Sequence, residues 1–185
     1  GKERFVYRGY YKQVFDIFTD RKGVRSSVVI DLLHGEILLP EAEIKLSKLH
    51  RREKALYALF LLESGSGGIN FSKPENVKAL KRFDHRMQLI QLKYEMIYDG
   101  FGGDKSRAPK IYLSENRLPM LSLIKQQIRQ IGELLSNADD YLVQRNLFGN
   151  YCVAIPPELC LCYDMQAKQI CRFEDSAFWS RGLAL

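Results

Sequence analysis

The chain has 185 residues, of which 46% are hydrophobic, and it carries a formal net charge of +6. This length suits one large domain or two small ones, and this composition excludes a disordered chain. No apolar run reaches the roughly 18–20 residues that a membrane-spanning helix needs, and the N-terminus lacks the pattern of a signal peptide. We expect a globular, cytoplasmic protein without a membrane role, whose basic charge favours an anionic partner.

All four cysteines lie in the last 34 residues, as Cys152, Cys160, Cys162 and Cys171. The spacing Cys160-x-Cys162 is not typical of zinc sites, and the three histidines lie far away in the sequence. We interpret the cysteines as reduced thiols that act as small buried hydrophobes. A metal or redox role is the alternative.

The N-terminal part of the chain reads as β structure. Short runs rich in β-branched and aromatic residues alternate with turn signals, a pattern that predicts an antiparallel meander. The run from Arg4 to Phe18 is either a first strand or the start of a helix. The other expected strands are 24–33, 36–39 and 41–46, with turns at Asp20–Gly23 and His34-Gly35.

Three amphipathic segments follow, each bounded by helix signals. The first begins at Ser47 as N-cap and ends at the glycine-rich run 64–68. The second spans Pro74 to Tyr98 behind a capping box formed by Ser72 and Glu75, with an apolar stripe from Val77 to Ile97 at helical spacing. The third is bounded by Leu118-Pro119 and runs to about Leu135. The loop 99–112 between the last two is long enough to be either mobile or functional.

Two hairpins are expected after the helices. Residues 141–145 and 151–155 form the first, around a turn at Asn146–Asn150, and residues 159–163 and 169–173 form the second. Phe178 and Trp179 should pack back on the domain. The predicted fold class is α+β, an N-terminal antiparallel meander followed by three helices and a β-hairpin. We divide it into a β-rich segment 1–46, a helix–hairpin domain 47–158 and a C-terminal extension 159–185.

Short motifs within this order resemble the winged-helix output domain of two-component response regulators. The runs Ile44-Lys-Leu-Ser47 and Ala55–Leu62 are similar to the start of that domain's first helix. Ile124–Arg129 resembles its recognition helix, and Tyr141–Val153, with Gly149 ahead of Tyr151, resembles its wing. The first helix is also similar to that of uncharacterised bacterial proteins. The chain departs from the family in its longer second helix, in the 99–112 insertion, in lacking a receiver domain, and in a third helix with few basic residues.

The resemblance implies a bacterial transcription regulator that binds double-stranded DNA, as a homodimer, with its third helix in the major groove. Lys125 and Arg129 would meet phosphate or guanine, while Ser122, Gln126 and Gln130 would bond to base edges. Arg145 and the wing tip, including Asn146 and Asn150, would meet phosphates. The alternative is that these side chains form an ordinary solvated face. Residues 114–185 carry 7 basic and 8 acidic side chains, whereas residues 1–113 carry 21 and 14.

A second basic set is the alternative surface for an anionic partner, unless it is ordinary surface charge. It consists of Lys78, Lys81, Arg82, Arg86, Lys105, Arg107 and Lys110.

Catalytic and cofactor motifs are absent from the sequence, so we expect neither an enzyme nor a bound cofactor or metal. The main functional alternative is a protein–protein assembly module that uses the long second helix. A third is a ligand-sensing domain with a pocket between the N-terminal sheet and the helices.

Overall fold

The computed structural model of the chain describes residues 23–185. The predictions for Arg4–Phe18, and for most of the turn at 20–23, lie outside these residues. The strands are β1 (Val28–Asp31), β2 (Glu36–Leu39), β3 (Ile44–Lys45), β4 (Val143–Arg145), β5 (Tyr151–Val153), β6 (Cys160–Asp164) and β7 (Gln169–Arg172). The helices are α2 (Arg51–Glu63), α3 (Val77–Gly100), α4 (Ser114–Gln130) and α5 (Ala177–Ala184), so the fold is α+β, as predicted.

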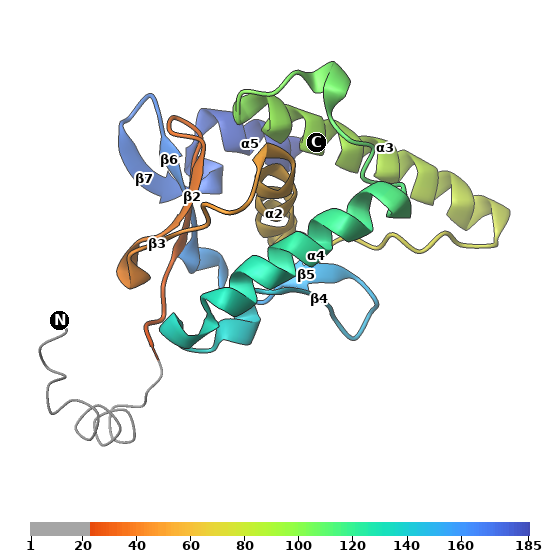
Figure 1. Ribbon diagram of the computed structural model, residues 1–185. Helices are drawn as coiled ribbons and strands as arrows, with labels where there is room; N and C mark the ends of the chain where they lie inside the picture. The colour runs from red at the N-terminus through yellow and green to blue at the C-terminus, as the bar shows by residue number, and fades with distance from the viewer. Residues whose placement is uncertain (1–22) are drawn as a thin grey trace, which may run out of the picture.

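The main sheet has five strands in the order β3-β2-β1-β6-β7 (Figure 1). The first three form the predicted antiparallel meander. The predicted second hairpin is also present, as β6 and β7. Its first strand pairs in parallel with β1, with Val28 opposite Cys160, so residues from the expected C-terminal extension complete the N-terminal sheet.

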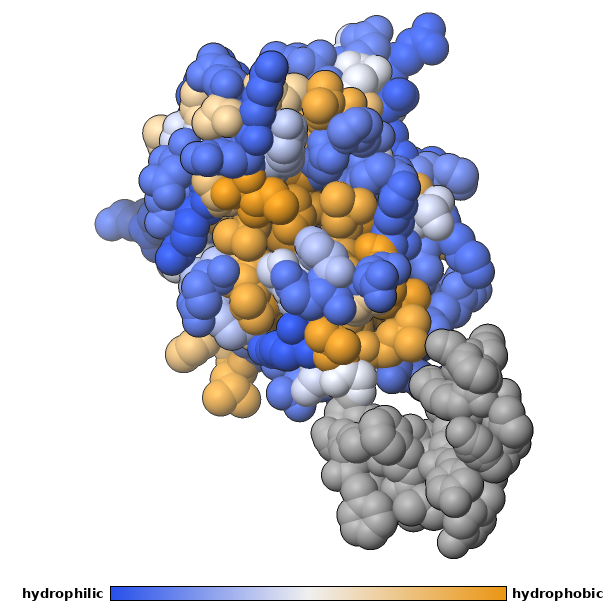
Figure 2. Space-filling view, turned by 90° about the vertical axis from the view of Figure 1, so that its left-hand side faces the viewer, coloured by the Kyte–Doolittle hydropathy of each residue, from blue (hydrophilic) through white to orange (hydrophobic). Residues whose placement is uncertain are grey.

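The two faces of this sheet differ. Alternate residues such as Ile30, Ile37 and Cys162 point into the main hydrophobic core. On the other face, Val29 stands between Leu38 and Leu161, and Ile170 on β7 is half exposed. Figure 2 shows apolar residues gathered in the middle of the side of the molecule where the sheet lies.

Helix α2 occupies the centre of the molecule (Figure 1). Ten of its 13 residues are buried, because its sequence is apolar around nearly the whole circumference. The predicted start at Ser47 is wrong. The helix begins at Arg51, after His50, whose N–H donates to Oε1 of Glu53 at 3.0 Å, and residues 47–49 form a turn.

Helix α3 also begins later than predicted. Its N-cap is Asn76, whose side chain accepts hydrogen bonds from the N–H groups of Lys78 and Ala79, rather than Ser72. All its buried residues lie at Met87 or beyond, and Val77, expected in the apolar stripe, is 70% exposed. The first half of α3 therefore projects from the rest of the fold (Figure 1).

Helix α4 starts before the predicted boundary. It begins at Ser114, ends at Gln130 and contains Pro119 in its interior. Proline is tolerated here at the loss of one backbone hydrogen bond, since it has no N–H to donate to the carbonyl four residues earlier. Its side chain is exposed, so the helix can accommodate it on its outer face.

The segment between α3 and α4 is packed against the fold. The Gln91 side chain donates to the carbonyl of Pro109 at 2.9 Å and accepts from the N–H of Ile111 at 2.9 Å. Ile111 and Ala108 are buried. We expected this loop to be either mobile or functional. Its contacts indicate instead that it holds α3 and α4 together.

The C-terminal segment forms α5, which the sequence patterns did not predict as a helix. Trp179 is buried and Phe178 packs against the core, as expected. Within residues 23–185, no helix combines the length and apolar character needed to cross a bilayer.

Candidate nucleic-acid interface

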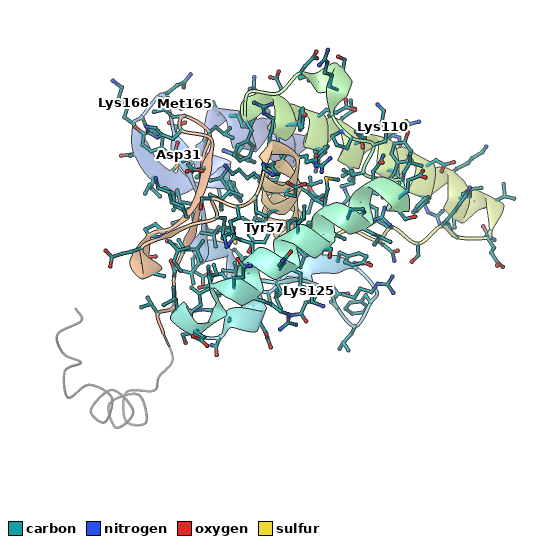
Figure 3. The ribbon with its side chains drawn as sticks, in the orientation of Figure 1. Asp31, Tyr57, Lys110, Lys125, Met165 and Lys168 are labelled. Atoms are coloured by element: carbon teal, nitrogen blue, oxygen red, sulfur yellow. The ribbon has the colours of Figure 1, made fainter. Side chains whose placement is uncertain are left out.

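Helix α4 presents one polar face to solvent. Its buried side rests on the core through Met120, Ile124 and Ile128. The five α4 residues predicted to contact DNA are all exposed: Ser122, Lys125, Gln126, Arg129 and Gln130. Figure 3 shows Lys125 on the side of α4 that is next to the β4–β5 hairpin.

A cation from outside α4 joins this face. The ammonium of Lys48 donates to Oε1 of Gln130 at 2.9 Å, and the backbone N–H of Lys48 donates to Oε1 of Gln127 at 2.9 Å. The segment before α2 is thereby fastened along the last turns of α4. Sequence patterns missed Lys48, because it lies 79 positions before Gln127.

The hairpin β4–β5 lies beside α4 and is tied to the helices through its backbone. Ile69, in the link between α2 and α3, exchanges two hydrogen bonds with Tyr151, of 2.9 and 2.8 Å. Arg145 is exposed, with its guanidinium 5.1 Å from the centroid of the Tyr151 ring. The hairpin is thus held at a defined position relative to α4.

Two positive charges meet where α4 approaches the hairpin. Burial lowers the pKa of Arg117, and the neighbouring charge of Arg145 acts in the same direction. The Arg117 guanidinium lies 3.9 Å from the centroid of the Phe71 ring and donates to the carbonyl of Ile111 at 2.8 Å. Arg117 therefore braces the start of α4, while Arg145 remains available to a partner.

The tip of the hairpin differs from the predicted phosphate contact. The side-chain amides of Asn146 and Asn150 both donate to the carbonyl of Gly67, at 3.3 and 3.0 Å. The side-chain Oδ1 of Asn146 also accepts from the backbone N–H groups of Phe148 and Asn150. The residues that reach furthest into solvent are apolar: Leu147 is 101% exposed and Phe148 83%.

The alternative basic set is divided by the fold. Lys78, Lys81 and Arg82 are exposed on the first turns of α3, whereas Lys105 and Arg107 follow its last residue. The 24 residues of α3 extend over about 36 Å at 1.5 Å each. Lys110, labelled in Figure 3, lies 3.6 Å from Glu95, and Arg86 is bound to Glu63. The seven cations do not form one patch.

The cysteines are placed mostly as expected. Cys160 and Cys162 are buried, and Cys152 and Cys171 are partly exposed. Burial raises the pKa of Cys160 to about 11 and that of Cys162 further, so these thiols are unreactive. Among residues 23–185 no three His, Cys, Asp or Glu side chains are grouped so that they could hold a metal ion.

Comparison with known proteins found no matching protein-family model, no similar curated protein and no similar solved structure. We call Lys48, Lys125, Arg129 and Arg145, together with the exposed face of α4, the α4 surface.

Proposed function

We propose that the protein binds duplex DNA through the α4 surface, with α4 in the major groove and the β4–β5 hairpin beside it, in the manner of a winged helix. The observation that carries the proposal is the exposed polar face of α4 lying next to a fixed hairpin that bears Arg145. Such a protein would act as a transcription regulator.

The dimensions of α4 support this function. Its 17 residues give a rod about 25 Å long, and an α-helix with side chains fits the major groove, about 12 Å wide. Ser122 and Gln126 carry hydroxyl and amide groups that can bond to base edges. Gln130 is held by Lys48 and is better suited to orienting that cation than to reading a base.

The charge of the surface also supports it. Four cations line it, and no acidic residue occurs in the sequence between Glu115 and Glu133. The net charge of −1 over residues 114–185 therefore does not describe this face. Four phosphate contacts would give a slope of log affinity against log salt of about −4.

The test compares DNA binding by the wild type with DNA binding by the double charge-reversal variant, Lys125→Glu with Arg129→Glu. Fluorescence anisotropy with labelled mixed-sequence duplexes at low salt should show wild-type binding. The variant should bind at least about a hundredfold more weakly, because two phosphate contacts become repulsive.

The matched control is Lys78→Glu with Lys81→Glu on the projecting half of α3. It changes the net charge of the protein by the same amount at exposed positions. At about 0.1 M salt, where the Debye length is about 10 Å, this control should bind DNA to within about threefold of the wild type, since its charges lie outside the proposed interface. Absence of wild-type binding, or equal losses in both variants, contradicts the proposal.

A second candidate function is protein–protein assembly through α3. A shallow groove of about 580 Å³ lies between α3 and the segment before α4, lined by Met87, Leu92 and Tyr112 among others. Leu92 and Tyr112 are both exposed, which is typical of a partner surface when such residues are adjacent.

Sedimentation and pull-down at high salt test this second function. A complex that survives high salt in the wild type and is lost in Leu92→Asp would support it, because phosphate contacts do not survive such conditions. A complex unaffected by Leu92→Asp excludes the α3 groove as its site.

A further inference from the structure

A second hollow among the described residues lies away from α4. It is a groove of about 1090 Å³ between the end of α2, the first half of α3, the end of the main sheet and the C-terminal residues. We call it the α2–α3 groove. Its lining includes Asn150 from the β4–β5 turn but no residue of α4, nor Lys48 or Arg145, so it is separate from the cations of the α4 surface.

The floor of this groove holds a buried ion network. Glu63, the last residue of α2, accepts hydrogen bonds from the Lys93 ammonium and the Arg86 guanidinium, each at 2.7 Å. Burial alone would raise the pKa of Glu63, but the bonds and charges of these two cations hold it below its usual value. Glu63 is therefore ionised at neutral pH.

This network is not electrically balanced. One carboxylate neutralises only one of the two cations that bind it. Arg82 adds a further cation to the lining, and Arg172 lies 3.5 Å from Glu174. The lining thus carries four basic and two acidic side chains. The groove has a surplus of positive charge.

The cations retain unused hydrogen-bond donors. An ammonium has three N–H groups and a guanidinium five. Among the described residues, Lys93 and Arg86 are each bonded through a side-chain donor to Glu63 alone. Lys93 is only 4% exposed and lies beneath the surface, whereas the Arg86 side chain is 37% exposed, so its remaining donors can reach a ligand in the groove. An anion entering the groove would meet donors that are already in position.

The rest of the wall is apolar. Phe83 of α3 and Phe173 at the end of β7 line the groove, as do Leu61, Pro157 and Leu183. Its volume is at the upper end of the range for small-molecule sites, which combine apolar walls with a few placed polar groups. Inorganic ions alone would leave this wall unused.

We propose that the α2–α3 groove binds an amphiphilic organic anion. Its carboxylate or phosphate group would bond to Arg82 and Arg86, with the buried charge of Lys93 beneath them, and its apolar chain or ring would pack on Phe83 and Phe173. The main sheet contributes to this groove only through the ends of β6 and β7, so it is not the pocket between the N-terminal strands and the helices that the sequence suggested for a ligand-sensing domain.

The chain carries its own reporter for this site. Trp179 is its only tryptophan, and its ring lies 5.0 Å, centroid to centroid, from that of Phe173, which lines the groove. Titration with dansyl-undecanoate below its micelle concentration should give saturable energy transfer from Trp179. Decanoate or decyl phosphate should displace the probe, and their relative potency identifies the preferred headgroup.

Two controls separate headgroup recognition from apolar binding. Decanol has the same chain without the charge and should displace the probe at least about tenfold less well, since a lost charged contact is worth about that factor. The variant Arg82→Gln with Arg86→Gln should weaken probe binding at least about tenfold. It leaves Glu63 paired with Lys93, so the buried carboxylate keeps one partner.

The matched variant is Lys78→Gln with Lys81→Gln, which removes the same charge from the same helix outside the groove. It should bind the probe like the wild type, as should Lys125→Glu with Arg129→Glu. No saturable transfer in the wild type overturns the proposal. So does equal displacement by decanol, or an equal loss in the matched variant.

Discussion

Helices α2 and α4 lie in the same fold but use their residues in opposite ways. Helix α2 buries ten of 13 residues, including both of its glutamates, Glu53 and Glu63. Helix α4 buries five of 17 and leaves Glu115 and its lysine and arginine face in solvent. The difference teaches that the glutamates of α2 are part of the packing, whereas the charges of α4, apart from the buried Arg117, are available to a partner.

The sharpest way to break this comparison is to remove a glutamate from each helix. Glu63→Ala should lower the free energy of unfolding by about 3–5 kcal/mol, because Lys93 and Arg86 lose the carboxylate that neutralises them. Glu115→Ala should change it by less than about 1 kcal/mol, since this side chain is exposed in the first turn of α4. Urea denaturation measures both, and similar losses would contradict the comparison.

Lowering the pH should destabilise the fold through Glu63 of α2, with a smaller effect than the Glu63→Ala substitution. The pKa of Glu63 in the folded state lies below its ordinary value of 4.5. Its stabilising contribution is therefore complete above pH 4.5 and is lost as the pH falls through the folded-state pKa. The free energy of unfolding of Glu63→Gln should fall less steeply over this range than that of the wild type.

Denaturant titrations of both proteins at several pH values check this. Glu41 and the other carboxylates are common to both, so the difference between the two curves isolates Glu63. Parallel curves would show that Glu63 does not carry a lowered pKa.

The smallest effect on stability belongs to the hairpin tip. Leu147→Ser with Phe148→Ser should change the free energy of unfolding by less than about 0.5 kcal/mol, since both side chains are almost fully exposed. DNA affinity should nevertheless fall severalfold, because apolar side chains beside a basic helix can wedge between base steps. Fluorescence anisotropy measures the DNA affinity, and thermal melting measures the stability. Unchanged affinity would remove the tip from the proposed interface.

Local patterns predicted much of the fold. Both hairpins and the meander occupy the expected residues, because each depends on neighbours along the chain, whereas α4 ends at Gln130 and not near Leu135 as predicted. Helix starts were less accurate, since Ser72 and Asn76 are both good N-cap residues and the sequence pattern does not distinguish between them. Pro119 was read as a boundary, although an exposed interior position tolerates it.

Long-range arrangements could not be predicted. The parallel pairing of β1 with β6 joins Val28 to Cys160, and no local pattern carries it. The spacing of polar residues predicted the exposed face of α4. It did not predict Lys48, which contacts this face from a turn that is distant in the sequence. The α2–α3 groove was missed for the same reason. Its floor contains the ion pair of Glu63 and Lys93, which belong to different helices, and no sequence pattern links them.

The pairing of β1 with β6 also bears on how the chain folds as it is synthesised. Strand β1 is complete more than a hundred residues before its partner emerges, which corresponds to roughly ten seconds of translation. During that time the nascent meander presents an open and mostly apolar edge, β1, while closure of so long a loop carries an entropic cost of about 4 kcal/mol. Newly made chains should therefore bind chaperones at β1. The core should reach its final form only after β6 has been synthesised and has paired with β1.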